Sequence, residues 1–231
     1  MQGWCNGDRV KYGIYFLLLA ALMLSITIQF GGCYWIMIYP ALSFAIVSIG
    51  YMGIGPRVFG KRPDGKRSLV ATFFLLPYLL LTLATWHLVR LVSREPAVNQ
   101  VDADLYLSRR LLRKELPETV TSVVDLTCEF TAPTYECSYF CFPVLDASCP
   151  SAEELKDLAK RILELPKPVL IHCAQGHGRT GLVASAVLFE TGKANSPEAA
   201  LALVQAVRPG VELNAIQKQA LLSLKVPTLS N

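Results

Sequence analysis

Apolar residues follow two different patterns along the chain. Over the first ninety residues they form long runs, and the segments 12–30, 33–55 and 69–86 hold no charged residue. Each run is long enough to cross about 30 Å of hydrocarbon as a helix. We therefore predict an all-α transmembrane region over residues 1–92, with hydrophobic segments at 12–30, 33–55 and 69–92.

Two of these segments have an alternative interpretation. The first would be a signal peptide if a small-residue cleavage site followed it, but Gly31 and Gly32 lead directly into a second apolar run. The third has Pro77 near its middle, where proline interrupts a helix. This favours a broken, re-entrant or interfacial segment, and a buried helix of a soluble protein is the remaining alternative.

Charge is divided unevenly between the two halves. The first 95 residues contain nine Lys and Arg against three Asp and Glu, a net charge of +6, which leaves −2 for the rest. Five of the basic residues lie in the loop 55–68, and six more lie between positions 90 and 114. Basic residues in short loops favour the cytoplasmic side. A hairpin followed by a re-entrant segment would place both flanks of the third segment there, whereas three full crossings would not, so the number of crossings stays open.

The basic loop 55–68 also bears on the partners of the protein. Nucleic acid is excluded as a partner because the loop is short and Phe59 is its one aromatic residue. Contact with the anionic headgroups of a lipid bilayer fits better. We expect an integral membrane protein with its second half on the cytoplasmic face.

The second half of the chain shows short strands that alternate with helices. Residues 93–103 are polar and unpatterned and predict a linker. β-branched and apolar runs predict strands at 120–127, 138–144 and 168–173. Helices are predicted from the capping box at Ser151 and Glu154, after residue 178, from Ser196, and from Asn214 to 224. This order predicts an α/β fold over residues 104–231, with a largely parallel sheet flanked by helices.

The stretch HCAQGHGRTG, residues 172–181, follows the last predicted strand and precedes an apolar helix. Backbone N–H groups that converge at a helix N-terminus bind anions, and glycines permit the tight curvature. A cysteine in this position is favoured as a thiolate. Cys173 is therefore the candidate nucleophile, Arg179 the clamp on two phosphate oxygens, and Thr180 a donor to the sulfur. His172 would order the loop or satisfy backbone groups.

CAQGHGRT resembles the C-x-x-G-x-x-R-[ST] signature of the protein tyrosine phosphatase superfamily, and HCAQGHGRTG resembles the loop of its dual-specificity members. DLYLSRRL, VTSVVDLTCEF and YFCFPVLDASCPSAEEL extend the resemblance over about residues 104–224. The resemblance implies a phosphate-binding loop formed by His172, Ala174, Gln175, Gly176, His177, Gly178 and Arg179. It also implies a two-step hydrolysis of phosphomonoesters through a cysteinyl-phosphate, without a metal or another cofactor.

A general acid is needed for the leaving oxygen. Asp146 follows a predicted strand, precedes a capped helix, and matches the general-acid aspartate of the family. Asp125 is its competitor, but it lies inside a predicted strand, where a structural hydrogen bond is expected. By analogy with tyrosine phosphatases, Asn214 and Gln217 are candidates for positioning water, although helix capping explains Asn214 equally well.

The resemblance leaves the substrate open between a phosphorylated protein and a phospholipid such as phosphatidylglycerophosphate or a phosphoinositide. Gln175 and His177 stand where tensin-homologue lipid phosphatases have lysines, which argues against an inositol polyphosphate. Two alternatives from other classes are a non-catalytic phosphate-binding module and a rhodanese-type sulfurtransferase, whose active loop is shorter. The seven cysteines are odd in number and form no C-x-x-C pair, which argues against a disulfide framework and against a zinc site.

Overall fold

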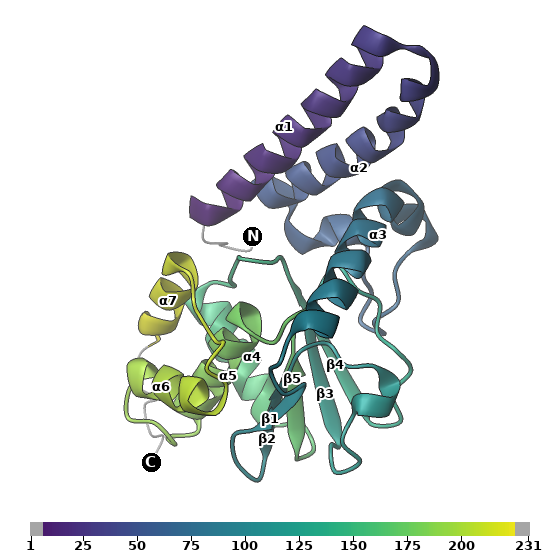
Figure 1. Ribbon diagram of the computed structural model, residues 1–231. Coiled ribbons are helices and arrows are strands. Elements are labelled where there is room, and N and C mark those ends of the chain that lie inside the picture. Colours follow the sequence, from purple (N-terminus) through teal and green to yellow (C-terminus); the bar gives the residue numbers. More distant parts are fainter. Residues whose placement is uncertain (1–6, 225–231) are drawn as a thin grey trace. The chain divides into compact units, whose positions relative to one another are not determined.

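The computed structural model describes residues 7–224, which divide into two compact units. We call residues 7–94 and 128–131 the helical unit, and residues 95–127 and 132–224 the sheet unit. Both are drawn in Figure 1. The short segment 128–131, which follows a strand of the sheet unit, therefore belongs to the helical unit by its contacts.

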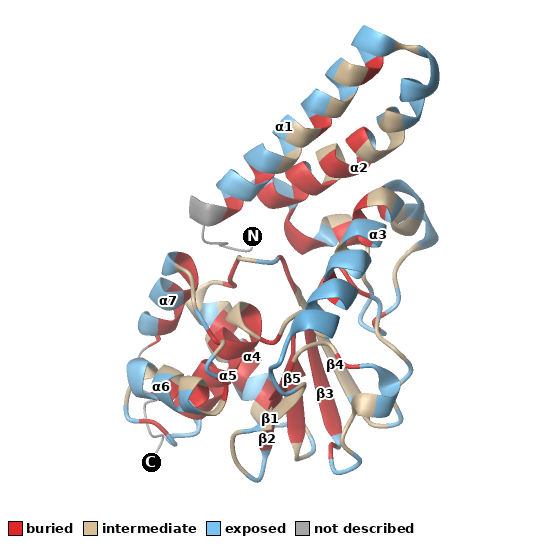
Figure 2. Ribbon diagram, in the orientation of Figure 1, coloured by how far each residue is buried: buried red, intermediate tan, exposed pale blue. Residues whose placement is uncertain are grey.

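The helical unit contains three helices, α1 (Gly7–Phe30), α2 (Ile38–Ile49) and α3 (Leu69–Val92). A 3₁₀ turn precedes α2, and a π turn and a second 3₁₀ turn continue it as far as Phe59. The helical stretches 9–30, 32–59 and 69–92 are long and apolar enough to cross a membrane. Many of their large apolar side chains are exposed, among them Ile36 at 79%, Leu69 at 87% and Leu91 at 78% (Figure 2).

The hairpin of α1 and α2 is closely packed. A side chain at Gly13 would place its Cβ 2.8 Å from the Cγ of Met52, so glycine permits this approach. The Ser48 hydroxyl donates to the Gly13 carbonyl oxygen at 2.7 Å. Small residues and hydroxyl bonds of this kind hold helices together where water does not drive their association.

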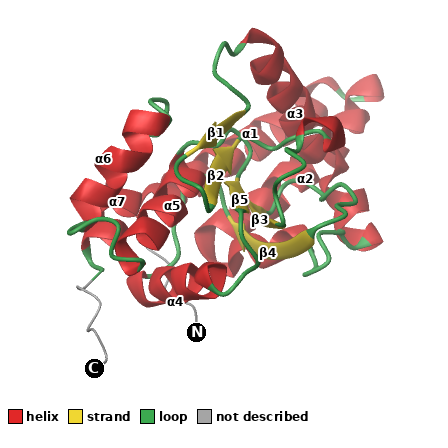
Figure 3. Cartoon of the chain, turned by 90° about the horizontal axis from the view of Figure 1, so that it is seen from below, coloured by secondary structure: helices red, strands yellow, loops and turns green. Residues whose placement is uncertain are grey.

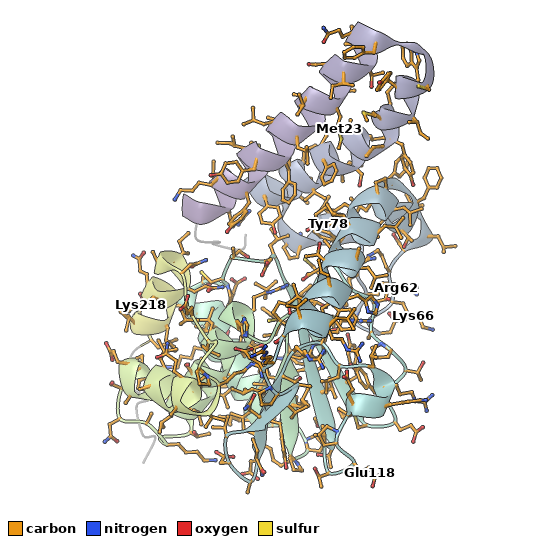
Figure 4. All side chains as sticks on the ribbon, in the orientation of Figure 1. Met23, Arg62, Lys66, Tyr78, Glu118 and Lys218 are labelled. Carbon is orange, nitrogen blue, oxygen red and sulfur yellow. The ribbon has the colours of Figure 1, made fainter. Side chains whose placement is uncertain are left out.

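Pro77 lies within α3, yet the helix is continuous from Leu69 to Val92, so the expected break is wrong. Proline lacks the N–H that would reach the carbonyl oxygen of Phe73. The hydroxyl of Tyr39 donates to that oxygen instead, and the N–H of Tyr78 donates to Ser43 Oγ at 3.3 Å. Tyr78 is labelled on α3 in Figure 4. Helix α2 therefore satisfies the backbone that proline disturbs, as neighbouring helices can do.

The loop between α2 and α3 forms a tight basic turn. Lys61 and Arg67 pair as an isolated antiparallel bridge, and the N–H of Lys66 donates to the Asp64 carboxylate at 3.0 Å. Arg62 and Lys66 are labelled on this loop in Figure 4. The turn gathers its positive charges into a short segment between two apolar helices.

The sheet unit contains five strands in the order β1-β2-β5-β3-β4. Their bounds are β1 (Val98–Gln100), β2 (Leu105–Ser108), β3 (Ser122–Thr127), β4 (Ser138–Val144) and β5 (Val169–His172). β1 pairs antiparallel with β2, and the other neighbours are parallel. The predicted α/β fold with a largely parallel sheet is confirmed. The segment 93–103, expected as a linker, contributes the edge strand β1.

Alternation along the strands divides the sheet into two faces. Leu105 and Leu107 of β2, Val124 and Leu126 of β3, and Ile171 of β5 belong to the large core on the helix side. The residues between them point to the opposite face, where Val123, Leu170 and Leu111 form a smaller cluster. His172 and Asp125 also fall on this second face by the same alternation.

Four helices cover the first face, and Figure 3 shows them together on one side of the sheet. They are α4 (Ala152–Leu163), α5 (Gly178–Glu190), α6 (Pro197–Val207) and α7 (Ala215–Leu222). The predicted capping box of α4 is present, with Ser151 accepting from the Glu154 N–H. Helix α5 is buried along almost its whole length. These helices confirm the predicted elements of the second half.

The carboxyl ends of the parallel strands meet at one edge of the sheet. In the register of the sheet, His172 of β5 lies beside Ser108 of β2 and Asp125 of β3. The loop after β5 therefore leaves the sheet between two other strand ends. In open α/β sheets this edge is where ligands bind.

Candidate active site

The loop 173–177 connects β5 to α5 and is shaped by its glycines. Gly176 has a φ of +76°, and a Cβ there would lie 2.5 Å from the carbonyl oxygen of Ser108. Any other residue would be strained in this conformation and would collide with the end of β2. At Gly181, a Cβ would lie 2.2 Å from Val211 Cγ1. This close approach brings the first turn of α5 against Val211.

Cys173 is the first residue after β5, and it is buried with 3% of its surface exposed. The N–H of Gly176 donates to its Sγ at 3.2 Å. The sulfur thus faces the interior of the loop at the amino end of α5, where N–H groups and the helix dipole stabilise negative charge.

Arg179 links this loop to the loop after β4. Its side chain is 1% exposed, and Nη1 donates to the carbonyl oxygen of Val144 at 2.9 Å. Its Nη2 lies 3.2 Å from Oδ1 of Asp146, whose side chain is 72% exposed. The structure therefore brings together Cys173, Arg179 and Asp146, although Asp146 is separated from the cysteine by 26 intervening positions in the sequence.

Asn214 and Gln217 hold the loop that carries Asp146. Asn214 caps α7 by accepting from the Gln217 N–H at 2.9 Å, and its Nδ2 donates to the Ala147 carbonyl oxygen at 2.8 Å. Gln217 is buried, and its Nε2 donates to the Ser148 carbonyl oxygen at 3.1 Å. A Cβ at Gly178 would lie 2.9 Å from Gln217 Oε1. Gln217 is thus located between the Asp146 loop and the amino end of α5.

Ala147 itself adopts a φ of +54°, the one positive φ of a residue other than glycine in the described part of the chain. A side chain in this region is strained by roughly 1–3 kcal/mol and persists only where neighbouring contacts hold it. The hydrogen bond from Asn214 to the Ala147 carbonyl is such a contact. The strained residue, Ala147, directly follows the candidate acid, Asp146.

His172 and Thr180 lie behind the loop and are both buried. A ring nitrogen of His172, Nδ1, lies 3.3 Å from the Cys173 carbonyl oxygen, and Nε2 lies 3.9 Å from Asp125 Oδ1. Among residues 7–224, the Thr180 hydroxyl has no hydrogen-bond partner. Ala174 and Gln175 complete the loop, and the Ala174 carbonyl oxygen accepts from the Arg110 N–H at 3.0 Å.

Asp125 has the structural duty expected of it. Its Oδ1 accepts from the N–H and the hydroxyl of Thr127 at 2.8 and 2.7 Å, and Oδ2 accepts from the Tyr139 hydroxyl at 2.8 Å. Burial, followed by the Asp125 charge, raises the pKa of Tyr139 above its usual range, so the phenol stays a proton donor. This network lies on the sheet face opposite the helices.

Sequence reasoning missed Arg208, which lies at the end of α6. It is 2% exposed, and its guanidinium donates to the carbonyl oxygens of Gly176 at 2.8 Å and Gln175 at 3.0 Å. Burial lowers the pKa of Arg208 from its ordinary value, while the charges of Glu95 and Cys173 act in the opposite direction. The arginine holds the loop from behind. The motif itself carried no signal of this contact, because 28 positions separate Arg208 from Thr180 in the sequence.

Sequence reasoning also missed Glu95. Its Oε2 lies 2.7 Å from Nε2 of His177, the residue before α5, and 3.7 Å from Nη2 of Arg208. Glu95 stands at the beginning of the predicted linker, where a polar residue is ordinary. A contact across 82 positions leaves no periodic pattern that a single sequence would show.

The fold and the loop together define an α/β domain with a cysteine and an arginine around an anion-binding turn. Residues 97–193 match the family model described as "Tc-R-P: Polymorphic toxin system, DSP-PTPase phosphatase". The sheet unit therefore carries a phosphatase domain of the dual-specificity and protein tyrosine phosphatase type. The match indicates a phosphoric monoester hydrolase of that type.

Solved structures of similar proteins cover about half of the chain. The crystal structure of Tk-PTP in the active form is 29% identical, with 55% of this chain and 94% of that chain covered and a TM-score of 0.49. PTPMT1 in complex with PI(5)P is 19% identical, with 55% and 92% covered and a TM-score of 0.49. Human DUSP28 is 20% identical, with 55% and 91% covered and a TM-score of 0.49. No curated protein is similar to this chain at a significant level.

Proposed function

We propose that this protein is a membrane-anchored phosphatase that works through a cysteinyl-phosphate on Cys173. The observation that supports this most directly is the contact of 3.2 Å between the Gly176 N–H and the Cys173 sulfur, inside a loop that Arg179 joins to Asp146. The candidate nucleophile and its N–H donor thus lie in the loop that precedes α5, and Arg179 at the start of α5 contacts the candidate acid.

In the first step, the phosphate occupies the loop formed by residues 172–179, and Arg179 holds two of its oxygens with its planar fork. The sulfur of Cys173 attacks phosphorus, and the bond from phosphorus to the leaving oxygen breaks. Asp146 donates a proton to that oxygen. The contact of Asp146 with Arg179 at 3.2 Å keeps the acid beside the phosphate site.

In the second step, water attacks the phosphorus of the cysteinyl-phosphate, Asp146 accepts a proton from it, and the sulfur leaves as a thiolate. Thr180 is proposed to donate its hydroxyl to the departing sulfur, since that hydroxyl is buried and has no other partner among residues 7–224. Gln217, beside Gly178, is proposed to orient the water. Asn214 is proposed to position the loop that carries Asp146, through the hydrogen bond from its Nδ2 to the Ala147 carbonyl oxygen.

We further propose that the substrate is a phospholipid phosphate. Three helices are long and apolar enough to cross a membrane, and only residues 93–97 separate the end of α3 from the beginning of β1. Tethering of this kind raises the effective concentration of lipid substrates at the active site. A phosphoprotein is the alternative substrate, and a non-catalytic phosphate-binding module is the alternative function.

The cytoplasmic face is the proposed location of the sheet unit, because glutathione keeps thiols reduced there and a reactive cysteine would otherwise be oxidised. Protease digestion of sealed, inside-out vesicles should cleave the sheet unit and leave the helical unit protected. Protection of the sheet unit in such vesicles would place it on the opposite side.

The deciding experiment measures phosphate release by the purified full-length protein and by Cys173→Ser in detergent micelles. The substrates are phosphatidylglycerophosphate, phosphoinositides and a phosphotyrosine peptide. Lipid turnover that disappears in the variant supports the proposal. Cleavage of the peptide alone would make the target a protein, and phosphate binding without turnover of any substrate would favour the non-catalytic module.

A further inference from the structure

A carboxylate lies at the edge of the phosphate-binding loop. Oε2 of Glu95 lies 2.7 Å from Nε2 of His177. Both side chains are partly exposed, Glu95 at 39% and His177 at 36%. His177 is the last residue of the loop before α5. Negative charge is unusual beside a site built to bind a phosphate dianion, so this pair calls for an explanation.

The pair is held in place by two further residues. Arg208 is buried behind the loop and lies 3.7 Å from the Glu95 carboxylate. At Gly210, a Cβ would lie 2.2 Å from Glu95 Oε1 and 2.7 Å from His177 Nε2. The absence of a side chain at Gly210 therefore leaves room for both groups. The Glu95 carboxylate thus contacts one ring nitrogen and lies near one guanidinium, in space that Gly210 leaves open.

The charges around the pair leave little to attract a second anion. Arg208 is buried and already donates to two loop carbonyls, and Glu95 offsets its charge. Arg109, whose backbone lies against Gly176, pairs with Glu115 at 2.9 Å. Gln175 is neutral. A substrate with one phosphate would bind in the N–H cradle, while a neighbouring phosphate would find the positive charge of Arg208 already offset by the Glu95 carboxylate.

We infer that Glu95 is a specificity-determining residue that restricts the site to substrates with a single phosphate group near the reacting one. This inference rests on the proposed function, because it assumes that the loop 172–179 binds the phosphate of the substrate. A carboxylate that offsets a nearby positive charge disfavours a ligand with a second anionic group without adding affinity for a ligand with one. The site would thus accept monophosphorylated headgroups and reject polyphosphorylated ones.

Binding is the sharpest test because it does not depend on turnover. In the full-length Cys173→Ser protein, isothermal titration gives the Kd of myo-inositol 1-phosphate and of myo-inositol 1,4,5-trisphosphate. We expect Glu95→Gln to lower the Kd of the trisphosphate by about tenfold and the Kd of the monophosphate by less than about threefold. Glu95→Asp, which keeps the charge, should retain the preference of the Cys173→Ser protein.

Asp102→Asn is the matched control. Asp102 pairs with Lys193 at 2.7 Å in the turn that precedes β2, at the sheet edge opposite the loop, so this variant makes the same change in net charge far along the strand. The ratio of the two Kd values should not change in this variant. The inference would be overturned if the ratio of the two Kd values were the same in Glu95→Gln as in Asp102→Asn. It would also be overturned if Glu95→Gln raised both Kd values by the same factor, because the pair would then be purely structural.

The two proposals fail in distinguishable ways. If the wild-type protein releases no phosphate from any substrate, p-nitrophenyl phosphate included, the proposed function is wrong, while the Kd ratio still decides the role of Glu95. If neither inositol phosphate binds to the Cys173→Ser protein, the inference is overturned, because the loop then holds no phosphate for Glu95 to discriminate.

Discussion

The helical unit and the sheet unit distribute polar and apolar groups in opposite ways. In the sheet unit, Leu126 and Ile171 are completely buried. In the helical unit, Ile36 and Leu69 are 79% and 87% exposed, whereas Ser48 is 1% exposed and bonds a backbone carbonyl. The comparison teaches that the two units treat apolar side chains differently: the sheet unit buries them, whereas the helical unit exposes many of them on helices that are long and apolar enough to cross a membrane.

The largest expected effect is the loss of phosphatase activity when Cys173 of the sheet unit is replaced, compared with replacement of a cysteine in the helical unit. Cys173→Ser should lower kcat by roughly 10⁴-fold or more, because the nucleophile of a covalent mechanism is removed. Phosphate release from p-nitrophenyl phosphate measures it. Cys33→Ser, at an exposed cysteine of the helical unit, is the matched control and should retain full activity. Equal activity of the two variants would refute a covalent role for Cys173.

The second effect concerns the acid. Asp146→Asn should lower kcat by about 10²–10⁴-fold for an alkyl phosphate, whose leaving oxygen needs a proton, and by much less for p-nitrophenyl phosphate. The ratio of the two rates is the measurement. Asp125→Asn serves as a comparison, since Asp125 is buried in a hydrogen-bond network and should show no dependence on the leaving group. A leaving-group dependence in that variant instead would reassign the acid.

A third prediction sharpens the contrast in packing. Leu126→Ala should destabilise the sheet unit by about 2–5 kcal/mol, because it leaves a cavity in a close-packed core. Ile36→Ala should change the stability of the helical unit in detergent by less than about 0.5 kcal/mol, since the side chain is already exposed. Chemical denaturation in micelles, followed by fluorescence, gives both values. Similar losses would mean that the exposed face of the helical unit is covered in the native protein.

The smallest effect concerns the buried network on the second face of the sheet. Tyr139→Phe should cost about 1–2 kcal/mol, because Oδ2 of Asp125 loses the donor that now lies at 2.8 Å. Thermal unfolding measures the change. Tyr106→Phe, in strand β2 of the same sheet, provides a control for removal of a tyrosine hydroxyl. If Tyr139→Phe lost no more stability than Tyr106→Phe, water would replace the hydrogen bond from the Tyr139 hydroxyl to Asp125.

Much of the sheet unit could be predicted because its signals are local. The capping boxes at Ser151 and Asn214 mark helix starts through residues three positions apart, and the β-branched run 122–127 marks a strand. The loop motif places Cys173 and Arg179 by spacing alone. The assignment of catalytic roles to these residues, to Asp146 and to Thr180 stays a prediction.

What could not be predicted depends on groups that are distant in the sequence. Strand β1 has only three residues, too few for an alternating pattern, and it forms because β2 offers a free edge. Glu95 and Arg208 reach the loop across long separations. The break predicted at Pro77 was wrong because the rule that proline breaks a helix considers one helix alone. In the structure, side chains of α2, Tyr39 and Ser43, form hydrogen bonds with the backbone of α3 on either side of the proline.

Those two hydrogen bonds between α2 and α3 have a consequence for biosynthesis. Tyr39 and Ser43, the two side chains that bond the backbone around Pro77, belong to α2, and α2 precedes α3 during translation. The ribosome thus delivers the supporting helix first, and the proline-containing helix can complete its bonds as soon as it emerges. Helix α3 therefore depends on α2: a chain shortened to begin after α2 would leave the Phe73 carbonyl oxygen without the hydroxyl donor that Tyr39 supplies.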